Sequence, residues 1–170
     1  MQNLSLLTLI VLAAGAAASA SCANPVHSDA VAALGDEAPG ERPGSTHRAG
    51  QPCLVCHGGD GPGPDFAIGG TIYAKRNGGQ ARPGVTVSLT DATGSTKTPV
   101  SNEVGNFYLT KQEWSPSYPV FVSLLYTDPI TKKVVSKDMI SRIGGNGGCG
   151  FCHHGPDNET FHMPPVFLSE

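Results

Sequence analysis

The chain is 170 residues long, enough for about one domain, and it carries a formal net charge of −3. It has 22 glycines and 14 prolines, which break helix interiors, and only 6% aromatic residues. This composition excludes a helix bundle and indicates a mainly β, loop-rich protein. The charge gives no electrostatic reason to expect nucleic acid or an anionic membrane surface as a partner.

The first residues have the features of an export signal. An apolar run from Leu6 to Ala18 ends in small residues, and Ala18-Ser19-Ala20 has the small-x-small form of a signal-peptidase site. The run is too short to cross a bilayer comfortably as an anchor, although no Lys or Arg precedes it. We therefore expect residues 1–21 to be a signal peptide and the mature protein to be exported to the periplasm or the cell surface.

Cys22 follows this segment directly. Ser19-Ala20-Ser21-Cys22 resembles the lipobox of bacterial lipoproteins, in which the cysteine becomes the acylated N-terminus. An unpaired thiol would be a hazard in an oxidising compartment. The resemblance implies lipidation of Cys22, and with it an outer-membrane lipoprotein whose contact with the membrane is made by the lipid. Ordinary cleavage that leaves a free thiol is the alternative.

The composition and the pattern of apolar residues change along the remaining chain. Residues 22–45 are mostly Ala, Pro, Gly and acidic residues without apolar periodicity, so we expect a flexible linker. Residues 66–140 contain short runs in which apolar and polar residues alternate, as in a strand with one buried face: Val85, Val87 and Leu89; Phe107 and Leu109; Val120, Val122, Leu124 and Tyr126. Turn signals at 77–79, 91–94, 105–106 and 128–129 separate the runs. The pattern predicts an antiparallel β-sandwich.

The sandwich segment resembles the carboxypeptidase-regulatory-like, transthyretin-like β-sandwich family. The resemblance is carried by strand and turn residues, namely Gly69-Gly70-Thr71-Ile72-Tyr73, Gly84-Val85-Thr86-Val87-Ser88-Leu89, Asp91 to Gly94, and Gly105-Asn106-Phe107-Tyr108-Leu109. It covers about 70 residues. It implies a structural or binding module and no catalysis by the sandwich itself.

Two copies of a C-x-x-C-H motif flank the sandwich. They are Cys53-Leu54-Val55-Cys56-His57 in the segment 46–65 and Cys149-Gly150-Phe151-Cys152-His153 in the segment 141–170. Both resemble the haem-attachment motif of c-type cytochromes, in which two thiols bond one porphyrin and the adjacent imidazole binds its iron. The resemblance implies two covalent haem c groups, attached through Cys53, Cys56, Cys149 and Cys152, with His57 and His153 as axial iron ligands.

Other uses of these cysteines remain open. A four-cysteine zinc site would also use two C-x-x-C pairs, but it would not need either histidine. Disulfides or a redox-active dithiol fit an exported protein and likewise leave the histidines unexplained.

The second axial ligand of each iron has several candidates. His47 lies six residues before the first motif, and His162 follows the second motif beyond a Gly-Pro turn signal, so these two are the leading candidates. His154, Met163 and Met139 are weaker candidates: His154 is next to a proximal ligand, Met163 lies close to its motif, and Met139 is at a strand end, where methionine usually belongs to a core. Histidines outnumber methionines here, which favours His/His coordination and a low potential. His27 lies in the linker and is expected to be free.

Taken together, the residues predict an exported dihaem c-type cytochrome that carries single electrons and is not an enzyme. Its expected partners are redox proteins or other cytochromes, and stacking into a multimer is compatible with two haems per chain. One alternative is an extracellular β-sandwich binding module stabilised by zinc or disulfides. The other is a small dihaem redox enzyme with an open iron.

Overall fold

A computed structural model describes residues 24–37, 39–40, 43–59, 61, 63–154 and 163–169. The chain forms two compact units, residues 1–35 and residues 36–170. The described part of the first unit contains the helix α2 (Pro25–Ala33), although the sequence predicted a flexible linker there. Asn24 caps the helix by accepting a hydrogen bond from the backbone N–H of His27, and Pro25 is pre-organised for the first turn. None of its residues is buried, so the helix has no apolar face that the sequence pattern could reveal.

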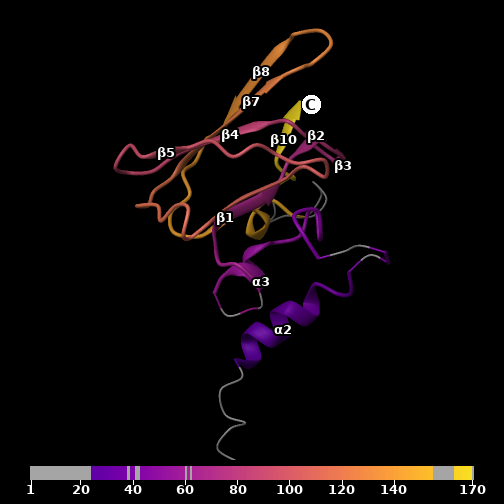
Figure 1. Ribbon diagram of the computed structural model, residues 1–170, viewed down its shortest axis with the longest axis vertical. Coiled ribbons are helices and arrows are strands. Elements are labelled where there is room, and N and C mark those ends of the chain that lie inside the picture. The colour runs from indigo at the N-terminus through magenta and orange to yellow at the C-terminus, as the bar shows by residue number, and fades with distance from the viewer. Residues whose placement is uncertain are drawn as a thin grey trace, which may run out of the picture. The chain divides into compact units, whose positions relative to one another are not determined.

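The second unit consists mainly of short strands (Figure 1). In chain order it contains α3 (Leu54–His57), β1 (Phe66–Thr71), β2 (Tyr73–Lys75), β3 (Gly78–Ala81), β4 (Thr86–Thr90), β5 (Thr96–Lys97), β6 (Asn106–Thr110), β7 (Phe121–Thr127), β8 (Val134–Asp138), β9 (Gly147–Gly148), the 3-10 turn η1 (Cys149–Phe151) and β10 (Phe167–Ser169).

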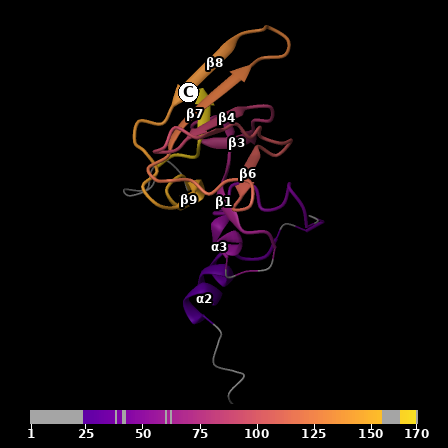
Figure 2. The same ribbon diagram turned by 60° about the vertical axis from the view of Figure 1, so that its left-hand side comes forward.

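The strands form three small sheets. Their orders are β6-β1-β9, β10-β2-β3 and β5-β4-β7-β8. Pairing is antiparallel except where β9 joins β1 and β10 joins β2. Figure 2 shows β6 and β9 on the two sides of β1. The register between β1 and β6 shifts between Phe66 and Ile68, a bulge at the start of the strand that follows the first motif.

The core lies between the β1–β6 pair and the β4–β7 pair. Alternation along β4 buries Val87 and Leu89, and alternation along β7 buries Val122, Leu124 and Tyr126. The same cluster includes Ile68, Ile72, Val85, Phe107, Trp114, Val120 and Leu168. Because burial follows the period of two in the sequence, the prediction of a mainly β, antiparallel sandwich with loop-rich ends is confirmed.

The C-terminal segment also contributes to the sheets. The glycine pair of β9 extends the β1–β6 sheet, and β10 lies beside β2 with Leu168 in the core. The second motif is therefore bracketed by two strands of the sandwich. In the described part of the chain, no helix has the length and apolar character that crossing a membrane requires.

Candidate functional site

The first motif packs on the β1–β6 pair. Cys53 precedes the single-turn helix α3, which contains Cys56 and His57. A β-carbon added at Gly69 of β1 would lie 3.5 Å from the Cβ of Cys53 and 3.5 Å from the Cβ of Tyr108. At this distance a methyl group on Gly69 would just touch the first motif, so Cys53 lies directly against β1.

The second motif packs on the neighbouring residue of the same strand. Cys149 follows β9 and begins η1. A β-carbon at Gly70 would lie 2.7 Å from the Cβ of Cys149 and 3.1 Å from its Sγ, closer than such atoms approach one another. Gly70 therefore provides the space that the second motif occupies.

The second motif also lies against the residue that precedes the first motif. A β-carbon added at Gly150 would lie 2.8 Å from the Cα of Pro52, the residue before the first motif. Gln51, Cys149 and His153 are among the residues that line one small hollow. The fold thus brings together two motifs that residues 58–148 separate in the sequence.

The two motifs share two backbone contacts, although α3 is an α-helix and η1 a 3-10 turn. The N–H of His57 donates to the carbonyl oxygen of Cys53 at 3.0 Å, and the N–H of His153 donates to that of Cys149 at 2.9 Å. The Sγ of each first cysteine lies near the carbonyl oxygen two residues earlier, at 3.7 Å for Cys53 and 3.8 Å for Cys149. Each motif therefore places its histidine one helical turn after its first thiol.

Both motif histidines form the same side-chain hydrogen bond. The Nδ1 of His57 lies 3.0 Å from the carbonyl oxygen of Pro64, and the Nδ1 of His153 lies 2.8 Å from that of Pro164. A carbonyl oxygen only accepts, so the neutral ring carries its proton on Nδ1 and leaves the Nε2 lone pair for another partner. This arrangement is typical of metal-binding histidines.

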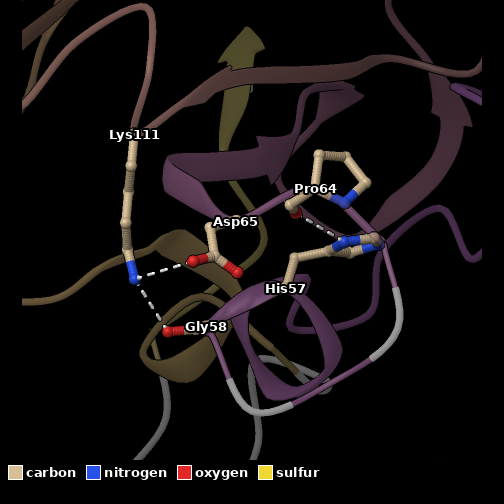
Figure 3. Close-up of polar contacts among 5 residues, drawn as sticks. All are labelled: His57, Gly58, Pro64, Asp65 and Lys111. Carbon is tan, nitrogen blue, oxygen red and sulfur yellow. Dashed lines mark hydrogen bonds and ion pairs between the residues drawn. The ribbon is translucent and has the colours of Figure 1, made fainter.

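The loop after the first motif is attached to the sandwich by Lys111 (Figure 3). Its Nζ donates to the carbonyl oxygen of Gly58 at 3.0 Å and lies 3.7 Å from the carboxylate of Asp65. Its backbone N–H donates to the carbonyl oxygen of Asp65 at 2.8 Å. One residue after β6 thus binds both ends of the loop that contains Pro64.

The ring of His57 also belongs to an aromatic stack. It lies on the ring of Phe66 with centroids 4.2 Å apart, and Phe66 lies on Tyr108 with centroids 4.5 Å apart. Phe66 is buried, so its contact fixes the plane of the His57 ring from one face. The structure also places His47 beside this histidine, with ring centroids 5.8 Å apart.

The other candidates for the second axial position lie in different surroundings. Met163 has its backbone N–H bonded to the carbonyl oxygen of Cys152 at 3.0 Å, and its side chain is exposed. His154 is partly buried beside the second motif. Met139 packs against the sandwich core, the usual place for a methionine at a strand end. His27 lies in α2.

Three predicted features concern residues that the structure does not describe. They are the signal peptide in residues 1–21, the lipidation site Cys22, and the distal candidate His162.

Burial suppresses ionisation of the first thiol of each motif. It raises the pKa of Cys149 to about 12, with a further contribution from the nearby Cys53. Burial likewise raises the pKa of Cys53, and the charge of Cys56 adds to this effect. Redox-active dithiols show the opposite, a lowered pKa. The four described cysteines form no disulfide.

One alternative from the sequence is a zinc site formed by the four cysteine side chains. Among the residues that the structure describes, no three His, Cys, Asp or Glu side chains gather closely enough to hold a metal ion.

Comparison of the chain with protein-family models, with curated proteins and with solved structures gave no match.

The sequence singled out the thiols and histidines of the site but not the groups that hold them. Pro64 and Pro164 act through main-chain oxygens, which carry no side-chain signal. Gly69 and Gly70 act through the absence of a side chain, and Lys111 is distant from both motifs in the sequence. Prolines follow each C-x-x-C-H motif in the sequence, but their spacing differs and does not single out the two acceptors.

Proposed function

We propose that this protein is an exported c-type cytochrome that binds two haem groups covalently and transfers single electrons. The observation that supports it best is the shared geometry of the two motifs. In both, the histidine follows the first thiol by one helical turn and donates its Nδ1–H to a prolyl carbonyl oxygen. A dithiol or disulfide function gives no reason for this arrangement, whereas an iron ligand requires a free Nε2 on an oriented ring.

The residues divide into attachment and ligand roles. Cys53 and Cys56 attach the first haem, and Cys149 and Cys152 attach the second. His57 and His153 bind the two irons through Nε2. The bound groups supply one-electron chemistry, since each iron alternates between the ferric and ferrous states. The chain itself orients the imidazoles, supplies apolar surroundings and offers the surface for redox partners, and we assign it no catalytic residue.

The proximity of the motifs supports electron transfer within one chain. Cys53 and Cys149 pack on adjacent glycines of β1, and Pro52 contacts Gly150. The attachment points are therefore neighbours on one strand, and this chain would hold both groups close together, where they would supply one-electron chemistry within a single protein. Other redox proteins, or further copies stacked into a multimer, would then be the external donors and acceptors.

The experiment that tests this function counts the haems. The full chain is expressed with haem-attachment machinery, and the intact mass and the pyridine haemochrome spectrum are measured. We expect two haems per chain, and the same mass reports the signal peptide and the lipid on Cys22. A colourless product that contains zinc would refute the proposal.

Two double variants make the count specific to each site. Cys53→Ala with Cys56→Ala, and Cys149→Ala with Cys152→Ala, should each leave one haem. Loss of both haems from each variant while the sandwich remains folded would show that the motifs do not act as separate sites. A low-spin spectrum of the wild type would support two six-coordinate irons, and a high-spin band would favour the alternative of an enzyme with an open iron.

A further inference from the structure

The acceptor of the His57 hydrogen bond belongs to a short loop whose two ends meet one lysine. The loop runs from Gly58 to Asp65, and Pro64 follows His57 by seven residues. Lys111 binds the loop at Gly58 and at Asp65, as Figure 3 shows. Both side chains of the ion pair are about half exposed, at 50% for Lys111 and 47% for Asp65. Either residue can therefore be substituted without disturbing the packing of the core.

The corresponding acceptor of the second motif is held differently. Pro164 follows His153 by eleven residues and leads into β10. Its neighbours are fixed by main-chain hydrogen bonds: Met163 N–H to the carbonyl oxygen of Cys152 at 3.0 Å, and Tyr73 N–H to that of Val166 at 2.8 Å. Main-chain hydrogen bonds therefore fix the second acceptor, whereas at the first a main-chain bond from Lys111 to Asp65 is supplemented by the Lys111 side chain, which also reaches Gly58.

We propose that Lys111 is a positioning residue for His57 and makes the first site electronically distinct from the second. The inference rests on the proposed function in so far as His57 is an iron ligand. By holding Gly58 and Asp65, Lys111 keeps the Pro64 carbonyl oxygen in reach of Nδ1. The hydrogen bond to that oxygen orients the ring and increases its basicity at Nε2. Without Lys111 the loop opens more often, and each opening removes the acceptor.

The direct test follows the Nδ1–H of both ligand histidines in one molecule. The two-haem protein is reduced, and solvent exchange of each imidazole Nδ1–H is measured by nitrogen-15 NMR. In Lys111→Met we expect exchange at His57 to be about fivefold faster, the effect of losing a half-exposed charged contact, and exchange at His153 to be unchanged. Lys111→Arg, which keeps a charged donor, should restore slow exchange.

A redox titration provides a second readout. In Lys111→Met one of the two reduction potentials should move and the other should stay, while Lys133→Met, a control at another exposed lysine, should move neither. Equal exchange at His57 in wild type and Lys111→Met would overturn the inference, and so would equal changes at both histidines.

The role of Lys111 in holding the loop can also be tested without haem. This test separates a failure of the Lys111 proposal from a failure of the proposed function. In the full chain made without attachment machinery, amide hydrogen exchange of Gly58, Gly59, Gly61, Gly63 and Asp65 should be faster in Lys111→Met than in Lys133→Met. If the haem count is wrong but this difference is found, Lys111 holds the loop and the proposed function is refuted. If two haems bind and the difference is absent, the proposed role of Lys111 is refuted and the proposed function is retained.

Discussion

Replacing Gly70 by alanine should disturb the second motif, whereas the same change at the neighbouring Gly69 should not. The new β-carbon would lie 2.7 Å from the Cβ of Cys149 and 3.3 Å from the ring of Phe107. The Cβ of Cys149 is attached directly to the backbone and cannot rotate away, so η1 or β1 must shift. Such overpacking costs about 1–3 kcal/mol.

Gly69→Ala is the matched control, one residue away on the same strand. Its β-carbon would meet the Cβ of Cys53 and the ring of Phe66 at 3.5 Å, an ordinary van der Waals distance. The change should therefore alter the free energy of unfolding by less than about 0.5 kcal/mol.

Urea denaturation of the full chain measures the difference between the two variants. With a slope of about 1–3 kcal/mol per molar, Gly70→Ala should lower the midpoint by roughly 1 M, and Gly69→Ala should leave it nearly unchanged. Intact mass after expression with attachment machinery should show incomplete loading at the second motif of Gly70→Ala alone. Equal midpoints and full loading in both variants would refute the packing of Cys149 on β1.

Three further changes test separate parts of the site and fold. His47→Ala should convert one low-spin haem to high-spin, whereas His27→Ala should not, and unchanged optical spectra in both would exclude His47 as a ligand. Hydrogen bonds, of which that from the Thr93 hydroxyl is the largest contributor, lower the pKa of Asp91. The stability that its carboxylate contributes should therefore be lost as the pH falls below about 4. Denaturation midpoints measured against pH should show this loss in the wild type and not in Asp91→Asn. In the haem-free chain, alkylation should label the exposed Cys152 before the less exposed Cys149. The labelling rate of Cys149 should keep rising above pH 9 because desolvation raises its pKa to about 12, and equal rates of the two thiols at neutral pH would contradict this.

The sandwich could be predicted because burial in its main strands follows the alternation of side chains. Val87 and Leu89 in β4, and Val122 and Leu124 in β7, are buried as the period of two requires. The turn before β6 was also readable, since Gly105 adopts a φ of +80° there, a conformation that glycine tolerates.

Other elements gave no apolar signal. The helix α2 buries no residue, so periodicity could not reveal it, and β9 consists of two glycines whose pairing with β1 depends only on backbone groups. The candidate site was likewise predictable only in part. Cysteine and histidine spacing identified the two motifs, but their meeting on Gly69 and Gly70 depends on which segments the sandwich brings together.

The positions of the supporting residues in the sequence also determine the order in which they are synthesised. Ribosomes build a chain from its N-terminus, and the described partners of His57, namely Pro64, Phe66 and Lys111, are all made before β7. The partner of His153 is Pro164, near the last strand, so the second histidine cannot gain its acceptor until synthesis has passed that residue. The described partners of the first histidine are therefore all present early in synthesis, whereas the second histidine gains its acceptor only when nearly the whole described chain has been made.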